Sequence, residues 1–168
     1  DNWEFANYTF YPPNDDDDDD GGQGEYRTIT LHPGANLISL PLEMWWNDVE
    51  DVMWYTYDTV VGILGEGVSA MLYNGMWLGS LTEFDPKSGY WMISDSGGDI
   101  EIEGTQIPDA WYNLHSGPNL ISYPGSYSMD IGDAFSQIFW DVDAVFGEGA
   151  AAMFMNGNIY GSLMELEP

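Results

Sequence analysis

The sequence of 168 residues contains no cysteine and only two basic residues, Arg27 and Lys87. Without cysteine the chain can form no disulfide, no thiolate metal site and no thiol nucleophile. The two basic residues stand against 29 acidic ones, which gives a formal net charge of -27. Because nucleic acid and anionic membranes are bound by clustered Lys and Arg, this charge excludes a nucleic-acid partner and disfavours a membrane surface.

Long apolar runs are also missing, since none approaches the ~18 residues of a membrane span, and we expect no membrane insertion. The hydrophobic content of 44% is nevertheless enough for a buried core. The first residue is Asp1 rather than Met, which predicts that a leader was removed. We therefore expect a secreted protein that is located outside the cell or on its surface.

The most informative feature that is present is an internal duplication. Residues 31–41 read LHPGANLISLP and residues 114–124 read LHSGPNLISYP, with eight of eleven positions identical. Residues 65–86 and 147–168 match at twelve of twenty-two positions. The second copy follows the first by 83 residues in the first block and by 82 in the second. The sequence therefore predicts two copies of one structural unit.

Each copy is predicted to be mostly β with one short helix. Residues 36–42 and 119–124 are typical of buried strands that follow a glycine turn. Asp48 and Asp130 stand at helix N-cap positions, ahead of apolar residues at helical spacing. Asn-Gly pairs at 74–75 and 156–157 indicate hairpin turns. The predicted fold class is mainly β, with two tandem β-sandwich-like repeats.

The two copies differ beyond their last matching residues, Pro86 and Pro168. The first copy continues with the apolar segments 89–94 and 99–104, whereas no such segments come after Pro168 in the sequence. Thirty residues precede the first copy, and 27 separate Pro86 from Leu114. The leading segment therefore has nearly the length of the missing one, and Trp3 can be aligned with Trp91.

From this match we predict that the N-terminal segment is a strand that completes the second repeat. The predicted donor side chains are aromatic, and the predicted acceptor face is apolar. The donor residues are Trp3, Phe5, Tyr8 and Phe10, and the acceptor residues are Ile121, Phe154, Met155 and Leu163. Two geometries are open: the strand closes on its own chain, or it inserts into a neighbouring subunit.

The corresponding domain prediction has four parts. Residues 1–13 are the donor strand, 14–25 an acidic linker, 26–105 the first repeat unit and 106–168 the second, which lacks its closing strands. Six adjacent Asp residues repel one another and stretch the linker. A stretched linker favours insertion into a neighbour over closure on the same chain.

The repeated blocks resemble known modules. G-x-N-L-I-S-x-P (34–41), G-E-G (65–67), G-S-L-x-E-x-x-P (79–86) and G-Y-W (89–91) are similar to tandem β-modules of secreted bacterial proteins. That resemblance implies an extracellular adhesive or structural role without catalytic residues. The strand completion at the chain ends resembles the donor-strand logic of pilins and similar fibril subunits.

The acidic run Asp15–Asp20 is the candidate metal site. Carboxylate oxygens suit Ca²⁺, and Asp16, Asp18 and Asp20 have the spacing of the first half of an EF-hand loop. The twelfth position would be Arg27 rather than Glu, so a complete EF-hand is excluded. The alternatives are a Ca²⁺ site of another kind and a solvated linker.

Other candidates for chemistry are weaker. Glu66 and Glu148 could form a carboxylate pair, but as repeat equivalents they indicate a shared turn rather than an acid and a base. His32 and His115 are also repeat equivalents beside turns, with no nucleophile placed for them by spacing. We therefore predict that the protein is not an enzyme.

Two functions are compatible with these observations. The first is a structural subunit of an extracellular fibril or pilus-like filament, which assembles head to tail with copies of itself through the N-terminal strand. The alternative is a secreted carbohydrate-binding or adhesive module with glycan partners, whose N-terminal strand closes on its own chain. Its candidate sugar-stacking residues are aromatic, namely Trp45, Trp46, Trp54, Tyr55, Tyr57 and Trp77.

Overall fold

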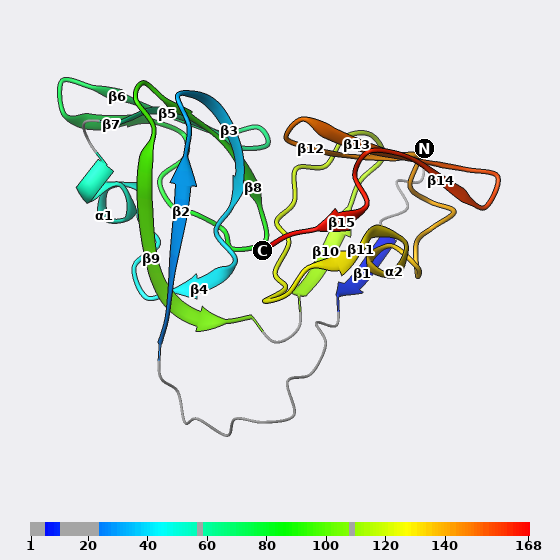
Figure 1. Ribbon diagram of the computed structural model, residues 1–168. Coiled ribbons are helices and arrows are strands. Elements are labelled where there is room, and N and C mark those ends of the chain that lie inside the picture. The colour runs from blue at the N-terminus through cyan, green and yellow to red at the C-terminus, as the bar shows by residue number, and fades with distance from the viewer. Residues whose placement is uncertain (1–5, 11–23, 57–58, 108–109) are drawn as a thin grey trace. The chain divides into compact units, whose positions relative to one another are not determined.

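The computed structural model describes residues 6–10, 24–56, 59–107 and 110–168, and it is mainly β, as predicted (Figure 1). The described residues form two compact units. Unit 1 contains residues 6–10, 110–118 and 125–168, and unit 2 contains the remaining described residues, with 119–124 among them.

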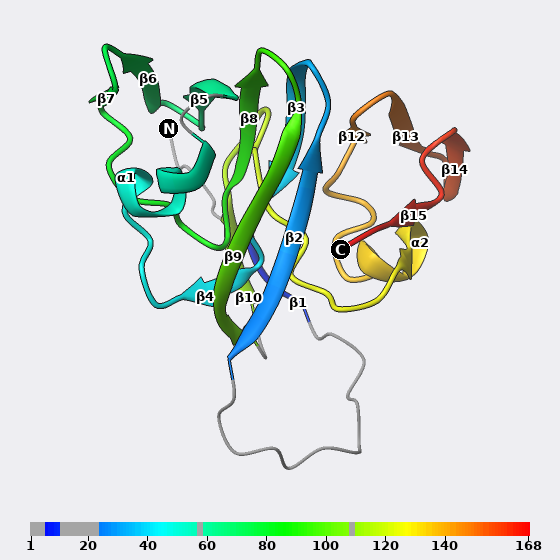
Figure 2. The same ribbon diagram turned by 60° about the vertical axis from the view of Figure 1, so that its left-hand side comes forward.

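Unit 2 has two antiparallel sheets. The larger has the strand order β3-β8-β5-β6-β7, and the smaller has the order β2-β9-β4 (Figure 2). The bounds of the larger sheet are β3 Gly34–Ser39, β8 Gly89–Ser94, β5 Val60–Leu64, β6 Ser69–Tyr73 and β7 Met76–Gly79. Those of the smaller are β2 Glu25–Leu31, β9 Gly98–Gln106 and β4 Leu42–Met44.

One apolar core lies between the two sheets of unit 2, which gives this unit a sandwich-like character. Ile63 and Met92 come from the larger sheet, Leu42 and Ile100 come from the smaller one, and none of the four side chains is exposed. β8 is an interior strand of its sheet, because it pairs with β3 on one edge and with β5 on the other. The core therefore depends on β8 for both packing and backbone pairing.

The helical segment of unit 2 is short, as predicted. α1 (Val49–Val52) is followed by a 3₁₀ turn, η1 (Trp54–Thr56). Of the predicted apolar face, Val49, Met53 and Thr56 are buried and Val52 is half-buried. The backbone N–H of Val49 donates to the carbonyl of Thr82 at 2.9 Å and so attaches the helix to the segment after β7.

Unit 1 contains three small antiparallel sheets. Their strand orders are β1-β10, β11-β15 and β12-β13-β14. The bounds are β1 Ala6–Phe10, β10 Ala110–Leu114, β11 Met129–Asp130, β15 Glu165–Leu166, β12 Ala144–Gly147, β13 Ala150–Met155 and β14 Asn158–Gly161.

The helix α2 (Ile131–Ala134) and the turn that follows it carry the predicted apolar face. Ile131, Ala134, Phe135 and Ile138 are all buried. The ring of Phe135 packs edge-on against Phe154 of β13, with 5.7 Å between the centroids. The side chains that have helical spacing in the sequence therefore build the interior of unit 1.

The two Asn-Gly pairs form the predicted hairpin turns. Asn74 and Gly75 have φ values of 51° and 77°, and Asn156 and Gly157 have 52° and 76°. Positive φ at both central residues is the geometry of a type I′ turn, which matches the twist of the strands on either side. The turns join β6 to β7 and β13 to β14.

The prediction of a strand over 119–124 is wrong. Its counterpart β3 has β8 beside it, but no strand of the described residues takes that place beside 119–124. This segment makes only an isolated bridge between Ile121 and Ser88. The N–H of Gly89 donates to Leu120, and that of Ser122 donates to Lys87, both at 3.0 Å. Without a full-length partner strand the segment cannot form a ladder.

Tyr90 joins the core of unit 2 to the turn before β8. Its side chain is 2% exposed, and its hydroxyl accepts a hydrogen bond from the Asp85 N–H at 2.7 Å. The same hydroxyl donates to the Asp85 carbonyl at 3.3 Å. Burial raises the pKa of Tyr90 above its ordinary value of 10.0.

We expect unit 2 to lose stability in alkali through Tyr90. A raised pKa in the folded state stabilises below the ordinary pKa, and this contribution is lost as the pH rises through the raised value. Tyr90→Phe should cost about 1 kcal/mol at pH 7, where two hydrogen bonds disappear. Between pH 9 and 11.5 the free energy of unfolding of Tyr90→Phe, measured in urea, should fall less than that of the wild type. Tyr73→Phe, at a side chain that is 63% exposed, is the control. Equal alkaline losses in the wild type and Tyr90→Phe would contradict the prediction.

Candidate functional site

The pairing of β1 with β10 is the feature that bears most directly on function. The strands are antiparallel, with Ala6 opposite Leu114 and Phe10 opposite Ala110. β10 is the sequence counterpart of β2, because Leu114 matches Leu31 in the duplicated blocks. In unit 2, Leu31 lies opposite Gly98 of β9. β1 therefore takes the place on β10 that β9 takes on β2.

This register differs from the one that the sequence suggests. The alignment of Trp3 with Trp91 would make the N-terminal segment a counterpart of β8, whereas Ala6–Phe10 corresponds to the first five residues of β9. Trp3 and Phe5 lie outside the described residues. Tyr8 and Phe10 lie in β1, opposite Tyr112 and Ala110. β1 is thus a closing strand of unit 1, but it closes a different edge from the predicted one.

The four predicted acceptor residues do not form one face. Phe154 is 7% exposed, whereas its neighbour Met155 on β13 is 47% exposed and points to the opposite side of the strand. Leu163 is half-buried next to Gly147, and Ile121 belongs to unit 2. None of the four lies in β10, the strand that β1 pairs with. Sequence reasoning missed β10, although its position before the LHSG block was the available signal.

One edge of β12 has no partner strand among the described residues. Its counterpart β5 pairs with β6 on one edge and with β8 on the other. Among the described residues β12 pairs with β13 alone. The second edge of β12 therefore presents backbone N–H and C=O groups that another strand can bind.

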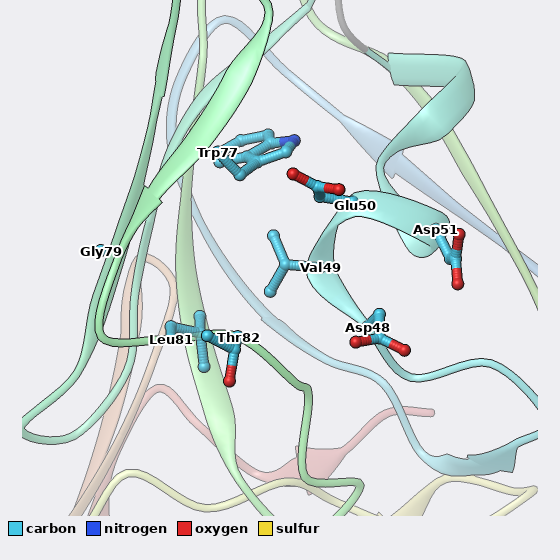
Figure 3. Close-up of a pocket in the computed structure, with 8 residues that line it drawn as sticks. All are labelled: Asp48, Val49, Glu50, Asp51, Trp77, Gly79, Leu81 and Thr82. Carbon is cyan, nitrogen blue, oxygen red and sulfur yellow. The ribbon is translucent and has the colours of Figure 1, made fainter.

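A pocket of about 280 Å³ lies beside α1 in unit 2 (Figure 3). Its lining includes Asp48, Glu50, Asp51 and Trp77, and the Glu50 carboxylate lies near the indole (Figure 3). Trp77 is 9% exposed, and its buried Nε1 has no hydrogen-bond partner among the described residues. Figure 3 shows this nitrogen on the side of the ring that faces Glu50. A buried donor without a partner costs about 1–3 kcal/mol, so a hydrogen-bond acceptor at this position would be stabilising.

The residues at the equivalent positions of unit 1 differ from those that line the pocket. Asp130, the counterpart of Asp48, accepts hydrogen bonds from Gly132 at 2.7 Å and Asp133 at 3.4 Å and so caps α2. Asp48 makes no side-chain capping bond to α1. Gly132 and Ile159 replace Glu50 and Trp77, and a Cβ on Gly132 would meet the Ile159 side chain at 3.2 Å. In unit 1 the Ile159 side chain therefore lies close to the backbone of α2.

The other predicted residues lie in structural positions. Glu66 Oε2 accepts a hydrogen bond from the Leu120 N–H at 2.9 Å, and Glu148 belongs to unit 1. Nδ1 of His32 lies 2.8 Å from the Pro33 carbonyl, and Nδ1 of His115 lies 3.0 Å from the Ser116 carbonyl. Each histidine therefore contacts the backbone of its own turn.

The remaining predictions concern metal binding and sugar binding. Asp16, Asp18 and Asp20 lie outside the described residues, and within those residues no group of three or more His, Asp or Glu side chains is arranged to hold a metal. Of the aromatic candidates, Trp45, Trp46 and Trp54 are at least half exposed, whereas Trp77 is in the core.

Comparison of the chain with protein-family models, with curated proteins and with solved structures gave no match. No helix within the described residues is long and apolar enough to cross a membrane.

The two N-cap positions give a test with a control in the same chain. Asp130→Ala should destabilise unit 1 by about 1 kcal/mol, since it removes both capping bonds to α2. Asp48→Ala should cost less than half of that, because no such bonds exist at α1. Urea unfolding of the two variants measures both values. A larger loss for Asp48→Ala than for Asp130→Ala would contradict the assignment.

Proposed function

We propose that this protein is the structural subunit of an extracellular filament, in which β1 of one chain pairs with β10 of the next. The observation that carries the proposal is the register of β1, which stands on β10 as β9 stands on β2. Unit 1 thus takes a closing strand from a distant part of the sequence. A strand that joins its sheet from a distant part of the sequence can be exchanged between identical chains.

The energetics of exchange support this proposal. The hydrogen bonds between β1 and β10 are the same within a chain and between chains, so exchange costs no backbone pairing. The equilibrium between the closed and the exchanged form is then set by the connection between β1 and β2 and by the protein concentration. Phe10 and Glu25 belong to different units, and the residues between them can span roughly 50 Å at about 3.3–3.6 Å per residue.

The sequence of this connection favours the exchanged form. It contains the six consecutive aspartates Asp15–Asp20, and like charges extend a linker at neutral pH. An extended linker lowers the effective concentration of β1 near its own β10 whenever the distance to be spanned is shorter than the linker. A β1 that is released from its own chain pairs with β10 of a neighbour, and repetition of that step builds a head-to-tail filament.

Engineered cysteines separate exchange from closure, because the chain has none of its own. Asn7 and Asn113 lie opposite each other in the β1–β10 pair, and opposite residues of antiparallel strands have the Cα separation that a disulfide needs. The variant Asn7→Cys/Asn113→Cys should give a ladder of covalent multimers on non-reducing gels. Negative-stain electron microscopy should show filaments in the same sample.

The matched control is Thr30→Cys/Asp99→Cys, at the corresponding pair of β2 and β9. Both of these strands belong to unit 2, so this disulfide forms within one chain and should give monomers only. Cross-linked monomers alone from the Asn7/Asn113 variant, at every protein concentration, would refute strand exchange and leave the closed form.

We propose in addition that Ca²⁺ binds the aspartate run through Asp16, Asp18 and Asp20. The support is chemical: the chain has two basic residues against 29 acidic ones, and carboxylate oxygens are the preferred ligands of Ca²⁺. Replacement of all three residues by Asn should reduce the heat of CaCl₂ binding in calorimetry at least fivefold. Asp95→Asn, outside the run, is the control, and equal binding by all three proteins would exclude this site.

A second candidate function, saccharide binding, is favoured by the pocket at Trp77. A sugar hydroxyl can accept from an indole N–H and donate to a carboxylate, and both groups line this pocket. A glycan array on the wild type and on Trp77→Phe tests it. Binding that the Phe variant loses would support the saccharide site, and binding that the Phe variant keeps would place any glycan elsewhere.

A further inference from the structure

Each unit carries a sheet whose outer face is apolar and exposed. In unit 2 the outer face of β5, β6 and β7, which we name face A, consists of Leu64, Met71, Tyr73, Met76 and Leu78. Met71 lies opposite Leu78, and Tyr73 lies opposite Met76. Opposite residues of paired strands share a face, so these side chains form one continuous surface.

Unit 1 has a corresponding surface on β12, β13 and β14, which we name face B. Its large members are Phe146, Met153, Met155 and Tyr160, which are 47% to 73% exposed. Met153 lies opposite Tyr160 and also opposite Ala144 of β12. Each of the four large residues stands 82 positions after a member of face A. The two sheets therefore expose apolar side chains at equivalent positions of the repeat.

The opposite sides of these sheets already face the interior of their own units. Ala70 and Trp77 are buried on the inner side of β6 and β7, as are Ala152 and Phe154 on the inner side of β13. An antiparallel sheet with one buried face normally has polar residues on the other. Here both sides are apolar, which is typical of strands that are covered on both faces.

The charge distribution sets the two faces apart from the rest of the chain. The net charge is -27, yet no residue of face A or face B carries a charge. Two copies of the chain repel each other through their acidic residues, and this repulsion is weakest where uncharged surfaces meet. A basic partner would be drawn to the carboxylates rather than to these faces. The charge pattern therefore favours a second copy of the chain as the occupant.

Face A supplies a large part of the area that such a contact needs. The members of face A are 43% to 63% exposed. Since a large side chain has about 150–250 Å² of surface, face A presents roughly 500 Å². A standard interface buries about 800 Å² on each partner, so one face supplies more than half of that area. The methionines at Met71, Met76, Met153 and Met155 add an adaptable surface for packing.

We infer that face A of one chain packs against face B of the next chain. This inference rests on the proposed filament, because strand exchange brings neighbouring chains together and the sheet faces then bury apolar area between them. Face A and face B are different surfaces of one chain, so a contact between them can continue from each chain to the next in a head-to-tail filament. The two faces would pack as sheets do in a sandwich, about 10 Å apart.

Lysine substitutions test the inference. Met71→Lys/Leu78→Lys changes face A, and Met153→Lys/Tyr160→Lys changes face B. Each variant should have a self-association constant at least tenfold lower than that of the wild type, as measured by sedimentation velocity. A mixture of the two variants should recover part of the association, since an intact face A then meets an intact face B. Both variants reduce the net negative charge, so weaker association cannot come from greater repulsion.

The control is Trp46→Lys/Trp54→Lys, which adds the same charge at exposed aromatics outside both faces. It should associate as the wild type does, and circular dichroism should show folded protein for all variants. Unchanged association of either face variant would overturn the inference. A loss of thermal stability in dilute monomers without any effect on association would also overturn it, because the faces would then pack within one chain.

The disulfide-linked multimers of Asn7→Cys/Asn113→Cys distinguish failure of the contact between face A and face B from failure of strand exchange. A ladder from Asn7→Cys/Asn113→Cys together with unaffected face variants would leave the filament and remove the face contact. Loss of association in both face variants without a ladder would leave the face contact and remove strand exchange.

Discussion

The rest of this structure depends on the backbone pairing of two strands, β8 in unit 2 and β10 in unit 1. In unit 2, β8 has β3 on one side and β5 on the other, and it brings Tyr90 and Met92 into the core. In unit 1, β10 is paired by β1, which comes from a distant part of the described chain. No strand of the described residues takes that place beside residues 119–124, and the sequence pattern that makes β3 makes only a bridge there.

Features that depend on near neighbours in the chain could be predicted from the sequence. The Asn-Gly turns, the buried faces of α1 and α2 and the mainly β class arise from local rules of conformation and spacing. Glycine recurs at the equivalent positions Gly79 and Gly161 for a reason that also lies within about ten residues of the chain. A Cβ at either position would collide with a backbone carbonyl, that of Ser69 or of Ala151, so both copies need glycine there.

Features that depend on distant partners could not be predicted in the same way. The register of β1 is fixed by pairing with a strand more than a hundred residues away, and one weakly matched tryptophan cannot specify it. Phe154 and Met155 are both apolar and adjacent, so their hydrophobicity does not reveal which of them faces the interior. The orphaned nitrogen of Trp77 also has no sequence signal, because it arises from which groups happen to surround the ring.

The order of strands along the chain has a consequence for synthesis on the ribosome. β1 is made before the strands of unit 2 and β10 is made after them, so β1 must wait unpaired while unit 2 folds. Contacts of such long sequence separation form slowly. In the proposed filament, this interval is the time in which β1 would be free to pair with β10 of another chain.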